Sequence, residues 1–130
     1  MPHIAVHLTQ NIAGLLDMDS MLEGCVRAVH DTAPEEFPLS GLRARAAVSS
    51  SWYAADGNPE NATIHVELHL IAGRDAGLCK RVAEAVLDDL QARTGPAYAG
   101  KPLSLSVEFF EMERRNYFAR NTFADFLGQR

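Results

Sequence analysis

The sequence lacks the features of several large classes of protein. No apolar run approaches the roughly 20 residues of a membrane-spanning helix, and the N-terminus has neither a basic leader nor a long apolar segment. Positive charge is not in excess either, because the formal net charge is -5. Nucleic acids and anionic membranes both favour clustered positive charge, so neither is expected as a partner. We therefore predict a cytoplasmic protein with no membrane and no nucleic-acid contact.

Cysteine is scarce, and the sequence has no CxxC motif, phosphate-binding loop or nucleophilic serine elbow. Cys25 and Cys79 lie on the apolar stripes of predicted helices, where cysteine usually acts as a small hydrophobic residue, so no disulfide is expected.

Four histidines raise the question of a metal site, since His3 with His7 and His65 with His69 lie on predicted strands. Residues i and i+4 of a strand are about 13 Å apart, so neither pair can chelate one ion. Only pairing across strands could build a metal site. We expect packing or hydrogen bonding at a subunit interface instead, with no metal and no cofactor.

The 130 residues, 47% hydrophobic and 22% charged, have the size and balance of one globular domain covering 1–130. A weak internal repeat divides it, because the segment His3–Leu8 (HIAVHL) recurs as His65–Leu70 (HVELHL). The pseudo-repeats are about 2–54 and 62–112, and a C-terminal extension, 113–130, follows them.

In the first half, alternating apolar residues predict strands at about 2–8 and 40–52. Apolar residues at helical spacing predict a helix at about 18–31 between them, and Ser20 with Glu23 could form a capping box at its start.

The second half repeats this order after a turn. Alternation predicts a third strand around 64–70 and a fourth at about 103–112. The helix between them is expected at about 75–94, with Asp75 as its N-cap and Gly95-Pro96 as its stop.

We therefore predict an α+β fold in which two strand-helix-strand units form a four-stranded mixed sheet with two helices on one face. The other face would carry histidines and charged residues, and neighbouring subunits are its simplest cover. These residues are His3, His7, His65, Glu67, His69, Arg43 and Arg45. The aromatic residues of the tail, 115–127, also need a surface on which to pack.

Pro2 is the first candidate for chemistry. Methionine before proline is normally excised, and the new terminus is a secondary amine. A free α-amino group has a reference pKa of about 7.7–8.0, which an apolar pocket beside arginines lowers further, as a general base requires. The alternative is a proline that simply starts an edge strand.

Three arginines and a tryptophan are the candidates for binding substrate. Arg43 and Arg45 point to one face of a strand about 7 Å apart, where they could hold one or two carboxylates. Arg74 lies at a strand-to-helix turn, where the helix N-terminus favours an anion. The alternative is that Arg43 and Arg45 are ordinary solvated strand residues and Arg74 a solvated turn residue. Trp52, at the end of the second strand, is either part of the core or a pocket wall.

Taken together, five motifs resemble the 5-carboxymethyl-2-hydroxymuconate delta-isomerase family of the tautomerase superfamily. They are Met1-Pro2-His3, the segment 38–45 (PLSGLRAR), Ala55-Asp56-Gly57, Ala72-Gly73-Arg74-Asp75 and the segment 116–121 (NYFARN). The resemblance implies a homotrimer with Pro2 as catalytic base and with Arg74 and Arg43 on substrate carboxylates. Arg45 also matches a family arginine, of unassigned role.

The implied reaction converts 5-carboxymethyl-2-hydroxymuconate, a dicarboxylate- or tricarboxylate-type substrate, to its 2-oxo isomer, a step in bacterial homoprotocatechuate breakdown. The first repeat has Asn11-Ile12 where the second has Gly73-Arg74, so one site per chain is expected. His7 departs from the acidic residue expected there. Two alternatives remain: a related tautomerase acting as decarboxylase or hydratase, and a non-enzymatic ferredoxin-like binding module.

Overall fold

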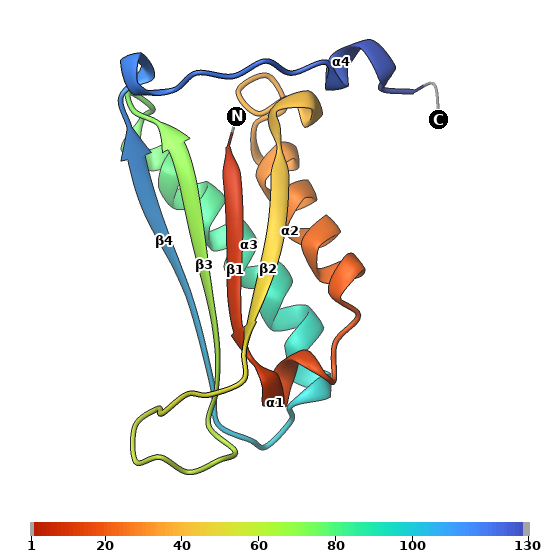
Figure 1. The fold of residues 1–130 in the computed structure, drawn as a ribbon, viewed down its shortest axis with the longest axis vertical. Helices are drawn as coiled ribbons and strands as arrows, with labels where there is room; N and C mark the ends of the chain where they lie inside the picture. Colours follow the sequence, from red (N-terminus) through yellow and green to blue (C-terminus); the bar gives the residue numbers. More distant parts are fainter. Residues whose placement is uncertain (1, 129–130) are drawn as a thin grey trace.

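The computed structural model describes residues 2–128, which form a mixed four-stranded sheet in the order β2-β1-β3-β4 (Figure 1). The strands are β1 (His3–Thr9), β2 (Arg43–Ser49), β3 (Ala62–Ile71) and β4 (Leu103–Met112). β1 runs parallel to β2 and antiparallel to β3, and β3 runs parallel to β4. The predicted α+β sheet of two strand-helix-strand units is confirmed.

Both long helices, α2 (Met18–Thr32) and α3 (Ala76–Ala97), lie on the same face of the sheet, as predicted (Figure 1). Four short elements complete the chain, and none was predicted: α1 (Gln10–Ala13), η1 (Leu39–Gly41), η2 (Arg114–Asn116) and α4 (Phe123–Phe126). Among the described residues, no helix is long and apolar enough to cross a membrane.

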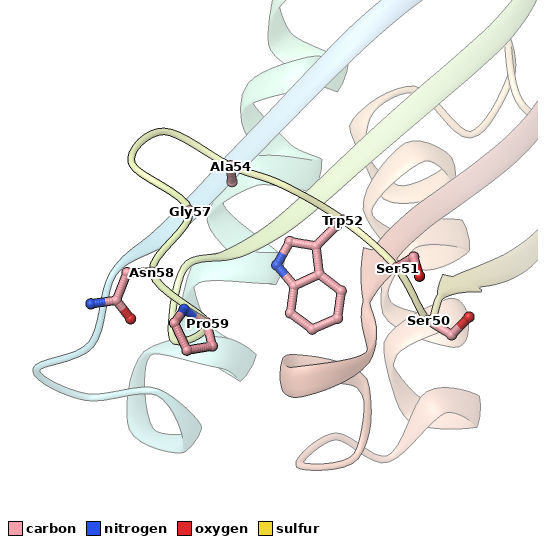
Figure 2. Close-up of a pocket in the computed structure, with 7 residues that line it drawn as sticks. All are labelled: Ser50, Ser51, Trp52, Ala54, Gly57, Asn58 and Pro59. Carbon is pink, nitrogen blue, oxygen red and sulfur yellow. The ribbon is translucent and has the colours of Figure 1, made fainter.

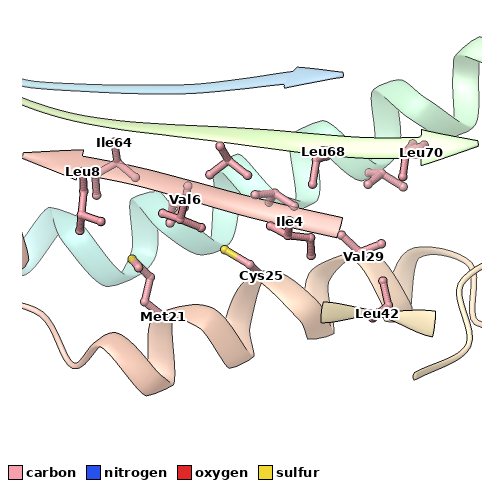
Figure 3. Packing of buried hydrophobic residues seen from close by; sticks show 14 of the residues in the cluster. Ile4, Val6, Leu8, Met21, Cys25, Val29, Leu42, Ile64, Leu68 and Leu70 are labelled. Atoms are coloured by element: carbon pink, nitrogen blue, oxygen red, sulfur yellow. The ribbon is translucent and has the colours of Figure 1, made fainter. Parts of the chain in front are cut away.

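The core lies between the sheet and the two helices (Figure 3). Ile4, Val6 and Leu8 of β1 point towards Met21 and Cys25 of α2, and all five side chains are at most 1% exposed. Burial raises the pKa of the Cys25 thiol to about 12, so it remains a protonated, apolar packing group. Cys25 and Cys79 are both free thiols, as predicted.

The helix boundaries differ from the prediction at two places. Asp17, not Ser20, is the N-cap of α2, and its carboxylate accepts a hydrogen bond from the Ser20 backbone N–H. The second difference is the C-terminal end of α3, which does not stop at Gly95-Pro96 but continues to Ala97. Leu90, Thr94 and Tyr98 are all buried on one side of this last turn, so tertiary packing outweighs the helix-breaking effect of proline.

The second strand is shorter than the predicted 40–52. Residues 39–41 form the 3₁₀ turn η1, and the strand ends at Ser49. Beyond it the chain leaves the sheet, and the Trp52 indole N–H donates to the carbonyl oxygen of Asn61 at 2.9 Å. Trp52 therefore anchors the β2–β3 loop.

The face of the sheet opposite the helices carries the histidines and charged residues expected there. The His7 Nε2 lies 3.4 Å from one carboxylate oxygen of Glu67, and the His69 Nε2 lies 3.1 Å from the other. The His65 Nε2 lies 3.3 Å from a carboxylate oxygen of Glu108. The hydrogen bond from His69 lowers the pKa of Glu67 below its ordinary value. Within residues 2–128 no group of three or more His, Cys, Asp or Glu side chains could hold a metal ion. His7 and His65 each pair with a carboxylate on a neighbouring strand, and His69 pairs with Glu67 on its own strand.

Candidate active site

Three of the predicted functional residues meet at one end of the sheet. Pro2 directly precedes β1, Arg43 begins β2, and Arg74 follows β3. Because β1 and β2 are parallel and β3 runs the opposite way, the starts of the first two strands lie beside the end of the third (Figure 1). Pro2 is buried there. The topology thus places Pro2 and two guanidinium groups at the same end of the sheet.

Arg43 is held in an unusual environment for a strand arginine. Its guanidinium carbon lies 5.5 Å from the centroid of the Phe123 ring, which comes from the C-terminal segment. Its Nε is buried and has no hydrogen-bond partner. Phe123 therefore covers one side of the guanidinium while an N–H donor stays available.

Arg74 is fixed by contacts on several sides. Its Nη1 donates to the carbonyl oxygen of Ile71 at 2.9 Å, and its guanidinium carbon lies 4.8 Å from the centroid of the fully buried Phe37 ring. Glu36 lies 3.6 Å from the Nε, close enough for an ion pair but too far for a hydrogen bond. The Nε donor of Arg74 is also unused.

These two Nε atoms stand out from the rest of the molecule. Within residues 2–128 they are the only buried side-chain nitrogen or oxygen atoms that lack a hydrogen-bond partner. A buried donor without a partner is costly, so such groups are rare in folded proteins. A carboxylate would supply the missing acceptor and match the planar guanidinium fork. The end of the sheet therefore has two donors suited to a substrate with more than one carboxylate.

His3 and Tyr117 are further candidate site residues: the sequence placed His3 on the open face and Tyr117 in the aromatic tail, but neither was assigned to the site. The His3 Nε2 and the Tyr117 hydroxyl are 3.1 Å apart, and the two rings meet edge to face. Burial, and then the positive charges of Arg43 and Arg45, lower the pKa of His3 below its ordinary value. The residue following Pro2 therefore carries a neutral imidazole at neutral pH. The signal in the sequence was the aromatic pattern of the tail.

Arg45 and Trp52 are placed differently from the other candidates. Arg45 lies on the open face two residues along β2 from Arg43 and is exposed. Trp52 lies beyond the opposite end of β2, and at about 3.3 Å per residue this strand alone separates the two ends by about 20 Å. Within one chain, Trp52 and Pro2 are not brought together.

Trp52 instead lines a hollow of about 320 Å³ within the β2–β3 loop (Figure 2). The other lining residues are Ser50, Ser51, Ala54, Gly57, Asn58 and Pro59. None of them is charged, so this hollow offers no ionic partner to a carboxylate.

Comparison with known proteins shows close relatives over nearly the whole chain. A family model described as 5-carboxymethyl-2-hydroxymuconate isomerase matches residues 2–127. The 5-carboxymethyl-2-hydroxymuconate Delta-isomerase of Escherichia coli is 29% identical over 123 residues, which are 93% of this chain and 94% of the relative.

Solved structures agree with the sequence matches. A 5-carboxymethyl-2-hydroxymuconate isomerase from Deinococcus radiodurans R1 superposes with a TM-score of 0.82 at 28% identity, covering 92% of this chain and 89% of that one. A fused 4-OT symmetric trimer has a TM-score of 0.63 at 22% identity, covering 90% and 94% of the two chains. The second likeness concerns the fold alone.

Proposed function

We propose a specific reaction for this chain, which belongs to the 5-carboxymethyl-2-hydroxymuconate isomerase family and is therefore an isomerase of the tautomerase superfamily. The proposed substrate is 5-carboxymethyl-2-hydroxymuconate or a close 2-hydroxymuconate, and the product is its 2-oxo isomer. Family membership sets aside the interpretation as a binding module without activity. Pro2 is the proposed base, after removal of Met1.

In the proposed mechanism, the Pro2 nitrogen takes the proton of the 2-hydroxyl group. The electron pair of the broken O–H bond forms the carbonyl, the conjugated double bonds shift, and the protonated amine returns a proton to a carbon of the conjugated chain in a 1,3- or 1,5-relocation. Atoms and electrons balance without a cofactor. General acid–base help is typically worth about 10²–10⁴-fold, so Arg43 and Arg74 are expected to add a comparable share by stabilising developing negative charge.

The observation that carries this proposal is the pair of buried Nε donors without a hydrogen-bond partner at the end of the sheet that also holds Pro2. A base beside two carboxylate-binding groups suits a substrate whose acidic proton lies between carboxylates. Arg45 lies on the same strand as Arg43 and contributes positive charge to the site. For Trp52, a role as pocket wall requires that another subunit bring it to Pro2.

We also propose that the protein is a homotrimer. The open sheet face carries His7, His65 and His69 with their carboxylate partners and His3 with Tyr117, whereas both long helices lie on the opposite face. The likeness to a fused 4-OT symmetric trimer supports this arrangement.

The test combines mass measurement with a substrate panel. The mature chain is expected to lack Met1, and the enzyme is expected to isomerise 2-hydroxymuconates without decarboxylating 3-oxo acids or hydrating their unsaturated analogues. Retained Met1 would cap Pro2 and overturn the proline mechanism. Activity restricted to decarboxylation or hydration would favour the related tautomerase reactions instead.

A further inference from the structure

The C-terminal segment, residues 113–128, crosses the end of the sheet where the N-terminus lies (Figure 1). Within this segment Tyr117 is half-buried and every other residue is exposed. Burial of apolar area therefore contributes little to holding the segment in place, and specific contacts must do so. The positions of those contacts bear on what the segment does.

Three contacts tie the segment to residues at or beside the proposed site. Tyr117 bonds to His3, the neighbour of Pro2, and the Phe123 ring lies over Arg43. Asn121 makes the third contact, since its side-chain Nδ2 donates to the carbonyl oxygen of Ser40 at 2.7 Å, in the turn that leads into Arg43.

Asn121 also determines where Phe123 lies. Its Oδ1 accepts a hydrogen bond from the Phe123 backbone N–H at 2.8 Å, while its Nδ2 holds the Ser40 carbonyl. One amide thus links the turn before β2 to the start of α4. The Phe123 ring is placed over the guanidinium by this bridge.

The contact between Phe123 and Arg43 leaves the guanidinium ordered but not saturated. An aromatic face attracts a guanidinium without using its N–H donors, because the attraction is to the ring quadrupole. Arg43 Nε stays buried and unpartnered beneath this cover. A carboxylate partner in the same place would have bonded to the donors that a substrate needs.

We propose that residues 113–128 act as a strap in which Phe123 is the positioning residue for Arg43, holding its guanidinium ready for a substrate carboxylate. The assignment of Arg43 to a carboxylate rests on the proposed function. The position of the guanidinium under Phe123 does not, and the two parts can be tested separately.

The kinetic test compares Phe123→Leu with Phe126→Leu. Phe126 is in the same short helix and is similarly exposed, but within residues 2–128 the Arg43 guanidinium lies over the ring of Phe123 and not over that of Phe126. Phe123→Leu is expected to raise KM for the 2-hydroxymuconate substrate about two- to sixfold, the usual strength of an exposed cation–π contact, with kcat unchanged. Phe123→Tyr, which keeps the ring, should restore KM, and Phe126→Leu should not alter it.

Asn121 offers a second variant. Asn121→Asp keeps the acceptor for the Phe123 N–H but loses the donor to Ser40, so it should raise KM as Phe123→Leu does. An equal effect of Phe126→Leu, or a failure of Phe123→Tyr to restore KM, would overturn the positioning role.

A measurement independent of turnover separates this inference from the proposed function. The NMR signal of the Arg43 Nε–H, identified by its loss in Arg43→Lys, should carry a ring-current shift that disappears in Phe123→Leu and persists in Phe126→Leu. Muconate, a dicarboxylate probe, should perturb the same signal. If Phe123→Leu leaves the Arg43 signal unmoved, Phe123 does not position the Arg43 guanidinium, even if the enzyme is active. If the signal moves with Phe123 but neither muconate binding nor isomerisation occurs, the proposed function fails and the contact between Phe123 and Arg43 stands.

Discussion

The backbone N–H of Arg43 donates to the carbonyl oxygen of Pro2 over 3.4 Å. This bond joins the first residue of β2 to the residue just before β1, and it uses main-chain atoms only. Changes to either side chain therefore leave the link in place. The proposed base and the proposed carboxylate-binding residue can be altered one at a time without displacing each other.

Pro2→Ala is expected to lower kcat by at least about tenfold while the fold and oligomer persist. The primary amine that results can still accept a proton, so activity should be impaired and not abolished. Steady-state kinetics with circular dichroism checks this, and Pro59→Ala in the exposed β2–β3 loop is the control. Full activity in Pro2→Ala would remove the proline mechanism and direct attention to His7 or His65.

The dependence of kcat/KM on pH should report the titration of the Pro2 amine. Only the neutral amine can act as base, so kcat/KM is expected to rise with pH through the amine pKa of the free enzyme. That inflection should fall below the reference range of about 7.7–8.0, because a buried site beside arginines disfavours the charged amine. A flat profile between about pH 5 and 9 would contradict the assignment.

Arg74→Ala should raise KM for a dicarboxylate substrate more than for a monocarboxylate one. Losing charge-assisted hydrogen bonds costs about 1.5–3 kcal/mol, and only where a carboxylate uses them. Arg81→Ala, an exposed arginine of α3, the helix that follows Arg74, is the matched control and should change neither KM. Equal losses of Arg74→Ala on both substrates would show a structural role.

Light scattering at micromolar concentration should give the mass of three chains. Ala5 lies at the centre of the open face, with Arg45 and Glu67 as its partners on the two neighbouring strands. Ala5→Glu places a second carboxylate beside Glu67 and should shift the protein towards monomers, whereas Ala92→Glu on the exposed side of α3 should not. A monomeric wild-type chain would refute the trimer.

Thermal stability should fall as the pH drops below about 6.5, the ordinary value of histidine. The pKa of His3 is lowered in the folded state by burial and by the charges of Arg43 and Arg45, so the unfolded chain takes up this proton first. The contribution of His3 to the free energy of unfolding is fully present above about pH 6.5 and is lost as the pH falls through its lowered folded-state pKa. His3→Gln should flatten this part of the Tm profile, and an unchanged slope would show that His3 is not responsible.

Much of the fold follows from local patterns in the chain. Alternation in 103–112 predicts β4 with its observed ends, and Asp75 caps α3 as expected, because both depend on neighbouring residues. The end of α3 and the length of β2 were predicted wrongly. Burial of Thr94 and Tyr98 carries the helix past Pro96, which is an effect of tertiary packing. The residues before Arg43 form a 3₁₀ turn closed by backbone hydrogen bonds to Pro38 and Leu39, which the alternation of apolar residues did not indicate.

The sequence by itself determined which residue types are available for the chemistry. An N-terminal proline, arginines at 43, 45 and 74, and an aromatic tail can all be read from it. Only the tertiary structure decided which of them meet. The direction of each strand brings Pro2, Arg43 and Arg74 to one end of the sheet and takes Trp52 to the other, because side chains on paired strands are ordered by register and not by separation along the chain. The position of Phe123 over Arg43 depends on the same physical fact: an interaction between residues 80 positions apart leaves no local pattern in the sequence.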